Sequence, residues 1–252
     1  MDAKQRFSDR VEHYIKYRPS YPPQIIDLLG AELGLQPTWA VADVGSGTGI
    51  LTDLLLRTNV RVYAVEPNRE MREAAERLLA ARPNFHSVNG AAEATTLEPS
   101  SVDLVTAGQA FHWFDGDKTR AEFTRILKPD GNVLLVWNDR KTASTPFLEA
   151  YDHLLRTRGL DYEQVNHRNV DHTRLLRFFG AEGYREAVFP NAQHFDWEGL
   201  RGRALSSSYV PPEGHPKHAT FMDGLAELHR TYQKDSFVRF DYDTRVYYGR
   251  LS

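Results

Sequence analysis

Between Trp39 and Trp137 the chain alternates short apolar runs with longer stretches in which apolar residues return every three or four positions. The short runs, rich in Val, Leu and Ala, predict strands over 39–44, 60–65, 85–89, 102–106 and 132–137. The longer stretches predict helices over 49–58, 68–82 and 119–127. Strands that alternate with helices are typical of βαβ units, so we expect an α/β fold with a mainly parallel sheet.

After Trp137 the pattern changes. Apolar spacing predicts helices over 146–158 and 171–179, and apolar–polar alternation predicts two long strands over 184–195 and 237–251, which we expect to be antiparallel. The region 197–233 between these strands predicts a lid with two helical pieces. We therefore expect a single domain over 1–252, with an N-terminal helical lid segment over 1–38, a ligand-binding core over 39–140 and a lid insertion over 197–233.

The composition narrows the class of protein. The 252 residues are 41% hydrophobic and 26% charged, which is ordinary for a globular chain, and the net charge of −3 argues against a nucleic-acid partner. The absence of cysteine excludes disulfides and thiolate metal sites, and no acid-flanked histidine pair predicts a metal site. Because the longest apolar run covers only 133–137, we expect a cytoplasmic protein without a membrane partner.

Three glycines follow the first predicted strand, at Gly45, Gly47 and Gly49. Such a loop lets a ligand approach backbone amides at the start of a helix. The dinucleotide fingerprint G-x-G-x-x-G/A would end on Ile50, so the spacing disagrees with a dinucleotide site. Glu66 ends the second predicted strand, 21 residues after Gly45, where a carboxylate can accept both hydroxyls of a ribose. The pair therefore predicts a nucleoside site.

The G-x-G-x-G loop, with Asp43 two residues before it, resembles the first motif of class I S-adenosylmethionine-dependent methyltransferases. The resemblance implies a Rossmann-like fold, with a seven-stranded, mostly parallel sheet containing one antiparallel strand, and S-adenosylmethionine as cofactor. Many members carry Asp where this chain has Ala91, so we expect backbone groups near Ala92 and Glu93 to bind the adenine. The expected cofactor-binding residues are Asp43, Gly45, Ser46, Gly47, Gly49, Glu66, Met71, Ala92, Glu93, Gln109 and Tyr17.

The fourth predicted strand leads into the loop 107–115, whose residues Gln-Ala-Phe-His-Trp-Phe resemble the small-molecule methyltransferases related to trans-aconitate methyltransferases. The same family pattern is seen in Phe7, Tyr14, the segments 17–19 and 21–22, and the Ser-Tyr pair that ends at Tyr209. The resemblance implies a small-molecule acceptor, either a carboxylate or a hydroxyl compound.

Within this family the expected catalytic residues are His112 and Trp113. The imidazole of His112 is the candidate base for a hydroxyl acceptor. For a carboxylate acceptor, Arg18 and Arg140 can orient the anion, because a guanidinium matches a carboxylate with two hydrogen bonds. Tyr209 is expected to wall the acceptor pocket. The simpler alternatives are that His112 is a hydrogen-bonded loop residue and that both arginines are solvated.

Two further functions stay open at this point. A nicotinamide-dependent oxidoreductase shares the fold and the ribose acid, although Ile50 and the lack of a Tyr-x-x-x-Lys pair argue against it. A non-catalytic module that binds S-adenosylmethionine is kept open by Ala91. A nucleic-acid methyltransferase ranks third, since no basic stripe with interleaved aromatics occurs. We expect a monomer or a homodimer.

Overall fold

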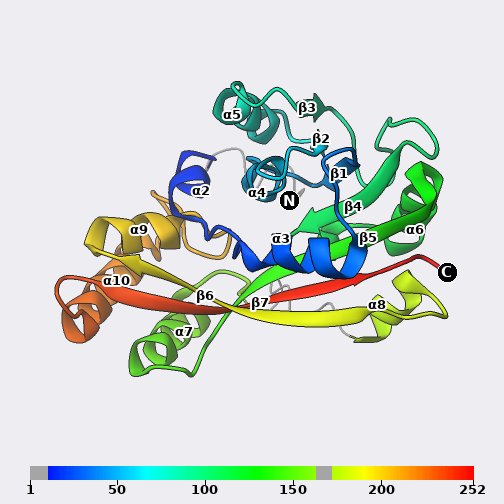
Figure 1. Ribbon diagram of the computed structural model, residues 1–252. Coiled ribbons are helices and arrows are strands. Elements are labelled where there is room, and N and C mark those ends of the chain that lie inside the picture. Colours follow the sequence, from blue (N-terminus) through cyan, green and yellow to red (C-terminus); the bar gives the residue numbers. More distant parts are fainter. Residues whose placement is uncertain (1–10, 163–171) are drawn as a thin grey trace. The chain divides into compact units, whose positions relative to one another are not determined.

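The structure is a computed structural model that describes residues 11–162 and 172–252 (Figure 1). The chain divides into two compact units. We call Ser20–Asn138, His167–Phe189 and Thr244–Ser252 the core unit, and the remaining residues, Met1–Pro19, Asp139–Asn166 and Pro190–Asp243, the helical unit. Phe7, which the family pattern includes, lies outside the described residues.

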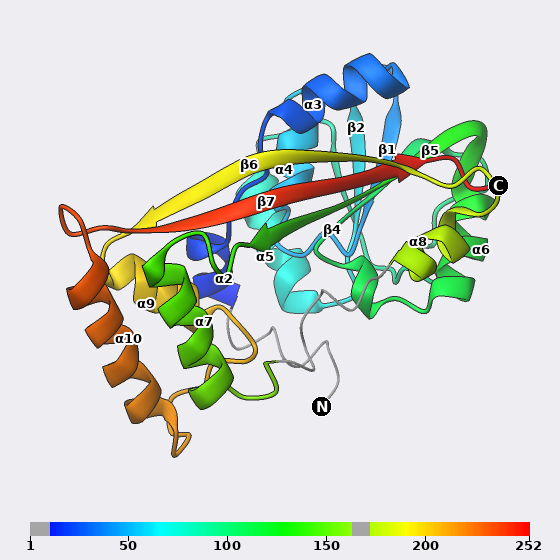
Figure 2. The same cartoon turned by 90° about the horizontal axis from the view of Figure 1, so that it is seen from below.

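A seven-stranded sheet has the order β3-β2-β1-β4-β5-β7-β6. Its strands are β1 (Ala40–Val44), β2 (Arg61–Val65), β3 (Phe85–Val88), β4 (Val102–Gly108), β5 (Leu127–Arg140), β6 (Arg185–Phe195) and β7 (Val238–Gly249). Strands β1 to β5 pair in parallel, and Figure 2 shows β7 running opposite to its neighbours β5 and β6. The predicted fold class, a mostly parallel seven-stranded sheet with one antiparallel strand, is confirmed.

Helices cover both faces of the sheet in the core unit. They are α3 (Gln24–Leu28), the π-helical turn η1 (Leu29–Leu33), α4 (Ile50–Leu56), α5 (Arg69–Leu79), α6 (Gly116–Ile126) and α8 (His172–Phe179). Alternate residues of β1 enter different apolar cores. Val41 belongs to the core that contains Leu51 and Leu55 of α4, whereas Ala42 belongs to the core that contains Phe123 of α6. All five residues of β1 are buried, as expected for a central parallel strand covered on both faces.

Strand β5 is longer than the predicted strand 132–137, because it begins at Leu127 directly after α6. Leu127 pairs with Val102, but the next paired residue, Leu104, lies opposite Asn132. The register therefore shifts within the Lys-Pro-Asp-Gly segment, 128–131. The apolar pattern predicts that this segment lies outside the strand.

The helical unit has its own apolar core. Its helices are α2 (Val11–Tyr17), α7 (Pro146–Arg158), α9 (Trp197–Leu205) and α10 (His218–Tyr232). Phe147 and Tyr151 of α7 pack against Phe240 of β7, with ring centroids 5.4 and 5.0 Å away. Helices α9 and α10 occupy the chain between β6 and β7, where the lid insertion is predicted.

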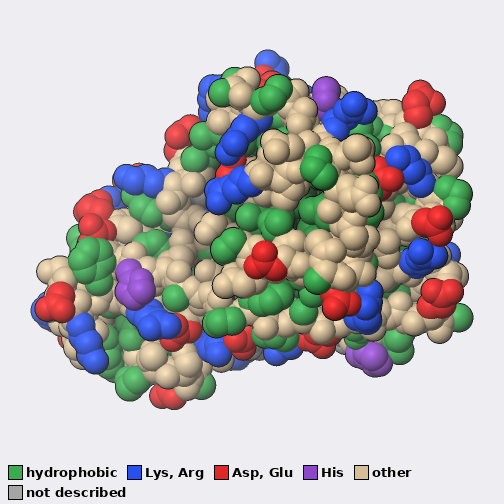
Figure 3. Space-filling view, viewed as in Figure 1, with side chains coloured by type: hydrophobic (Ala, Val, Ile, Leu, Met, Phe, Trp, Pro, Cys, Tyr) green, Lys and Arg blue, Asp and Glu red, His purple; other side chains and the backbone are tan. Residues whose placement is uncertain are grey.

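Among the described residues no helix is long and apolar enough to cross a membrane. On the face shown in Figure 3, Lys and Arg side chains are interspersed with Asp and Glu.

Candidate functional site

The glycine loop joins the end of β1 to α4, and its backbone is held against the end of β2. The N–H groups of Gly45 and Ser46 both donate to the carbonyl of Val65, over 2.9 and 3.2 Å. Gly45 and Gly47 have φ values of +67° and +58°, which cost other residues about 1–2 kcal/mol. A Cβ on Gly45 would collide with Ala110, whereas the space around Gly47 is open. Position 45 therefore needs glycine for packing, and position 47 leaves backbone accessible to a ligand.

Glu66 lies directly beside this loop, as its spacing predicts. The residue is 8% exposed, and its carboxylate accepts hydrogen bonds from the backbone N–H groups of Gly47 and Asn68, over 2.9 and 2.8 Å. Asn68 caps α5 by accepting from the backbone N–H of Met71, whose side chain is buried. The acid, the loop and the start of α5 thus form one continuous surface; the ribose role of Glu66 and the adenine contact of Met71 remain predictions.

The loop also holds polar atoms that fit the predicted nucleoside. The hydroxyls of Ser46 and Thr48 are buried and have no hydrogen-bond partner among the described residues. Buried hydroxyls in folded proteins normally have partners, so these two oxygens indicate a polar ligand. With the open space at Gly47 and the carboxylate of Glu66, the loop offers both donors and acceptors to a ligand that carries hydroxyl and amino groups.

Asp43 lies beneath the loop rather than on its surface. Its fully buried carboxylate accepts hydrogen bonds from the hydroxyl of Thr52 in α4, over 2.6 Å, and from that of Thr106 in β4, over 3.0 Å. Burial raises the pKa of Asp43 to about 6, and the charge of Glu66 adds to the rise, while the two threonine hydrogen bonds lower it. Asp43 therefore ties β1 to its neighbours and supports the loop from below.

The loop after β3 carries the predicted adenine contacts. Ala91 and Ala94 exchange two backbone hydrogen bonds of 3.1 Å, which fold the loop tightly around the buried Ala92. The carboxylate of Glu93 accepts from the backbone N–H of Asp115, over 2.8 Å. The side chain of Glu93 therefore links this loop to the one after β4, and the adenine role of both residues stays a prediction.

Glu122 of α6 anchors the same loop, and the sequence reasoning did not single it out. Its carboxylate accepts from the backbone N–H and hydroxyl of Thr95, over 2.8 and 2.5 Å, and from the guanidinium of Arg125. The Arg125 hydrogen bond, together with those from Thr95, lowers the pKa of Glu122 to about 2 although burial opposes the shift. Glu122 is therefore ionised at neutral pH and holds the loop in place.

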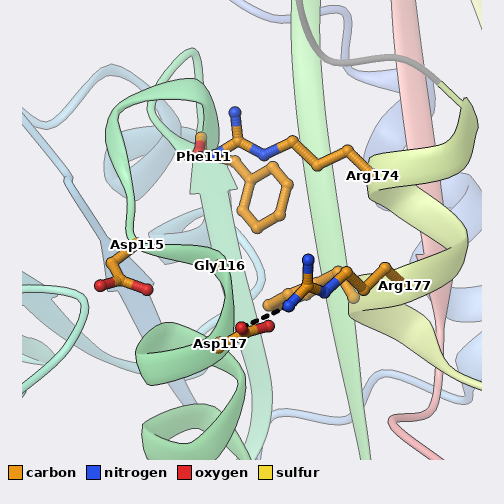
Figure 4. Close-up of a pocket in the computed structure, with 7 residues that line it drawn as sticks. Phe111, Asp115, Gly116, Asp117, Arg174 and Arg177 are labelled. Carbon is orange, nitrogen blue, oxygen red and sulfur yellow. Dashed lines mark hydrogen bonds and ion pairs between the residues drawn. The ribbon is translucent and has the colours of Figure 1, made fainter.

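The histidine and tryptophan predicted to act in catalysis lie on a short 3₁₀ turn, η2 (Phe111–Trp113). Arg174 of α8 donates to the carbonyls of Phe111 and Phe114, over 3.0 and 2.9 Å, and its guanidinium lies 5.0 Å from the centre of the Phe111 ring. Figure 4 shows Arg174 reaching from α8 across the Phe111 ring. Arg174, which the sequence did not indicate, therefore fixes both ends of the turn.

A cavity of about 230 Å³ lies between this turn and α8 (Figure 4). It is lined by Phe111, Asp115, Gly116, Asp117, Arg174, Arg177 and Phe178. Arg177 and Asp117 form an exposed ion pair at its edge, 2.5 Å between N and O. Because the charges of this pair offset each other, the edge of the cavity favours neither anions nor cations.

On the turn itself, Trp113 is 40% exposed and its ring lies 4.9 Å from that of His112. The indole N–H of the buried Trp137 donates to Nδ1 of His112, over 3.4 Å. This hydrogen bond links His112 to β5 and engages Nδ1 of its imidazole.

Gln109, at the end of β4, has a strained backbone with φ of +54°. Its amide nitrogen donates to the carbonyl of Asn138 over 3.3 Å, but its buried Oε1 has no partner among the described residues. Strained residues often lie at functional sites, and the unsatisfied oxygen indicates a donor on a ligand. This supports the predicted cofactor contact of Gln109 without testing it.

The remaining predicted residues belong to the helical unit. The Tyr17 ring lies directly against Gly202 of α9, and its carbonyl accepts from Gln193. The guanidinium of Arg18 donates to the carbonyl of Ser206, over 2.8 Å. Arg140, at the end of β5, is buried and bonds Asp152 over 2.8 Å, so it is not a solvated surface residue.

Arg140 belongs to a buried cluster of arginines and tyrosines around Tyr209. Burial by itself would raise the pKa of the Tyr209 hydroxyl, but the positive charges of Arg203, Arg140 and Arg18 lower it below its usual range. Arg203, which the sequence reasoning missed, is 5% exposed and bonds the hydroxyls of Ser207 and Tyr242. The structure thus brings together the three predicted acceptor residues, Arg18, Arg140 and Tyr209, and adds Arg203 to them.

The part of the chain that the structure describes shows no arrangement suited to a metal ion. Within residues 11–162 and 172–252, no group of three or more His, Cys, Asp or Glu side chains is placed to hold one.

Comparison with known proteins shows which family the chain resembles. The profile of the methyltransferase domain family matches residues 42–135. An uncharacterised methyltransferase of Schizosaccharomyces pombe is 30% identical over 246 residues, covering 96% of this chain and 95% of its own length. An uncharacterised methyltransferase of Mycobacterium bovis is 40% identical over 139 residues, which are 55% of this chain and 54% of that protein.

Solved structures agree on the fold. A protein of Anaeromyxobacter dehalogenans, proposed as a type II methyltransferase, has a TM-score of 0.66 at 23% identity, over 93% of this chain and 98% of its own. Phosphoethanolamine N-methyltransferase 2 of Haemonchus contortus has a TM-score of 0.53 at 14% identity, over 96% of this chain and 56% of its own. With the glycine loop, Glu66 and the sheet order in place, the chain belongs to the class I methyltransferases and uses S-adenosylmethionine as its methyl donor.

Proposed function

We propose that the methyl acceptor is a small carboxylic acid, as in the trans-aconitate methyltransferases that the sequence resembles. The observation that carries the proposal is the excess of positive charge buried around Tyr209. Arg140 has a carboxylate partner in Asp152, but the hydrogen bonds of Arg203 to other described residues go to hydroxyls. A buried guanidinium without a counter-charge is costly, so the cluster favours binding of an anion.

The surrounding tyrosines supply further donors for such an anion. The hydroxyl of Tyr151 is buried and has no hydrogen-bond partner among the described residues. The Arg140 guanidinium lies 5.1 Å from the centre of the Tyr151 ring, so this hydroxyl belongs to the same cluster. An acid bound here would accept hydrogen bonds from guanidinium and phenol groups together.

On this proposal the donor-binding residues lie in the core unit. Glu66 would accept the ribose hydroxyls, the backbone near Ala92 and Glu93 would bind the adenine beside Met71, and the hydroxyls and amides of the glycine loop would bind the polar tail. The unsatisfied Oε1 of Gln109 would accept from the amino group of that tail.

Bound S-adenosylmethionine supplies a methyl group already activated on a sulfonium. The chain then has to orient the acceptor in line and exclude water, which accounts for much of the rate gain in such displacements. A carboxylate acceptor is ionised at neutral pH and loses no proton on methylation. The arginine cluster would orient it, and no base would be required.

The test is methyl transfer from labelled S-adenosylmethionine to a panel of mono-, di- and tricarboxylic acids, phenols and alcohols. We expect methyl esters of acids as products. Arg203→Gln should raise the KM for the acid about tenfold or more, the equivalent of one charge-assisted hydrogen bond, and leave the affinity for S-adenosylmethionine unchanged.

The matched control is Arg201→Gln on the same helix, since Arg201 is about half exposed and its acidic neighbour Glu198 lies 3.9 Å away. This variant should behave as the unmodified protein. Methylation of phenols or alcohols alone would contradict the carboxylate assignment. Binding of the donor with no acceptor methylated would favour a non-catalytic module.

A further inference from the structure

Arg203 is held by two hydroxyl groups of the helical unit. It lies on α9 and is 5% exposed, and its guanidinium carbon is 5.9 Å from the centre of the Phe240 ring. Its Nε donates to the hydroxyl of Tyr242 over 3.4 Å, and its Nη1 donates to that of Ser207 over 2.9 Å. A guanidinium has five N–H donors, so one that is held at Nε and Nη1 still has N–H groups to offer a bound acid.

The direction of the hydrogen bonds around Tyr242 follows from the chemistry of its partners. The amide nitrogen of Gln193 donates to the carbonyl of Tyr17 over 3.2 Å, so Oε1 is the amide atom that faces Tyr242. The Tyr242 hydroxyl has one proton, which it donates to this oxygen over 2.9 Å. A lone pair of the same hydroxyl then faces Arg203, whose Nε can only donate. Gln193 thus makes the Tyr242 hydroxyl an acceptor for Arg203.

The ring that carries this hydroxyl is fixed by its neighbours. Tyr242 lies on β7 and is 1% exposed, and its ring is stacked on that of Phe240, with centroids 6.4 Å apart. The Phe240 ring makes edge contacts with Tyr151 and Phe195, at centroid distances of 5.0 and 5.4 Å. The acceptor for Arg203 is therefore held in place by the apolar core of the helical unit.

We propose that Tyr242 is a positioning residue that orients the Arg203 guanidinium for the acid, and that Gln193 orients the Tyr242 hydroxyl. The proposal rests on the proposed function, in which Arg203 binds the acid. Arginine has many rotamers, and fixing them before the acid arrives reduces the entropy that is lost on binding. Tyr242 and Gln193 thus increase the affinity for the acid without contacting it. Because Gln193, Arg203 and Tyr242 all belong to the helical unit, this role is independent of where the methyl donor lies.

The first test reads the hydrogen bond of Arg203 without any acceptor. In proton–nitrogen correlation spectra of ¹⁵N-arginine-labelled protein, the Nε–H signal of Arg203, assigned by its loss in Arg203→Gln, should exchange slowly with water. Tyr242→Phe keeps the ring but removes the hydroxyl, so it should shift this signal and speed its exchange about tenfold. The control is Tyr232→Phe, at a half-buried tyrosine of α10 whose ring contacts Phe147, and it should leave the signal unchanged. An Nε–H signal that Tyr242→Phe does not affect would overturn the proposal.

The second test uses an acid that the acceptor screen identifies. Tyr242→Phe should raise the KM for this acid about three- to tenfold, the worth of one neutral hydrogen bond, and leave kcat and the affinity for S-adenosylmethionine unchanged. Gln193→Met, which keeps the length of the side chain and removes the amide, should raise KM as well. When Arg203→Gln is already present, Tyr242→Phe should change KM by less than about twofold, because the group that it orients is gone.

The outcomes separate a failure of the positioning role from a failure of the proposed function. An equal rise in KM from Tyr242→Phe with and without Arg203 would identify a general structural effect and overturn the positioning role. An unchanged KM in both Tyr242→Phe and Gln193→Met would also overturn it. In both cases acids would still be methylated, and the proposed function would stand. If only phenols or alcohols were methylated, the proposed function would fail, and the role of Tyr242 in acid binding would fail with it.

Discussion

Replacing Asp43 by Asn should stabilise the protein at neutral pH, and this stabilisation should decrease as the pH is lowered. Burial raises the pKa of Asp43 to about 6 in the folded protein, from an ordinary value of 3.8 in the unfolded chain. Between these values the folded state binds more protons than the unfolded state. The contribution of Asp43 to the free energy of unfolding therefore falls as the pH rises through this window, and it is constant above it. The difference of about 2 pKa units corresponds to roughly 3 kcal/mol.

The side chain of Asn is suited to this test because it is neutral and has nearly the same shape. The hydroxyls of Thr52 and Thr106 now both donate to the carboxylate, and one of them can turn to accept from the amide. The assay is urea unfolding without cofactor, at intervals from pH 4 to pH 7.5. The free energy of unfolding of Asp43→Asn minus that of the unmodified protein should rise by roughly 2–2.5 kcal/mol over this range, since the rest of the difference develops below pH 4.

Glu122→Gln provides the control with the opposite sign. Hydrogen bonds from Arg125 and Thr95 lower the pKa of Glu122 to about 2, from 4.5, so its stabilising contribution is present above pH 4.5 and is lost as the pH falls through about 2. This variant should be less stable than the unmodified protein, by a nearly constant amount above pH 5. If the stability difference for Asp43→Asn were equally flat, or fell with pH, the inference of a destabilising buried carboxylate would be refuted.

Three further variants test the site. Glu66→Ala should weaken binding of S-adenosylmethionine and of its demethylated product about 10- to 100-fold in calorimetric titrations, the worth of hydrogen bonds to a charged group, and unchanged heats would contradict the ribose assignment. Gly47→Ala should lower Tm by only a few degrees, from backbone strain at φ +58°, but reduce donor affinity more than that strain explains. Arg174→Met should lower kcat several-fold with unchanged donor affinity, because the η2 carbonyls lose their donors, whereas the exposed neighbour Arg177→Met should not; equal kcat values in the two would remove the positioning role of Arg174.

The spacing of apolar residues predicts most of the helices and strands, because each of these elements buries a regular set of positions. The helix α7 begins and ends at the predicted residues, Pro146 and Arg158, since Thr145 caps it and Gly159 follows it. Strand β5 departs from the prediction because Leu127 pairs with Val102 through a register shift that no periodicity encodes. The pairing of distant segments, unlike the type of each segment, depends on contacts that spacing alone does not specify.

The position of Glu66 beside the glycine loop could be predicted, because it depends on two neighbouring strands. Gly45 and Glu66 follow adjacent parallel strands, and the carboxyl ends of such strands meet at one edge of a sheet. Arg174 and Glu122 act on loops 60 and 27 residues away in the chain, on Phe114 and Thr95, and nothing near them in sequence indicates those targets. Residues that hold a loop in place are therefore harder to find than the residues on the loop.

Arg203 is one of 31 basic residues, yet the sequence does contain a signal for it. Leu200, Arg203, Ala204 and Ser207 recur at helical spacing along and just after α9, and all four are buried. An arginine on the buried face of a helix is rarely tolerated unless its charge has a partner. Among residues 11–162 and 172–252 the hydrogen-bond partners of Arg203 are hydroxyls, and under the proposed function this buried charge binds the acid. A charged residue at an apolar position of a helix should thus be treated as a candidate ligand contact, before any motif is considered.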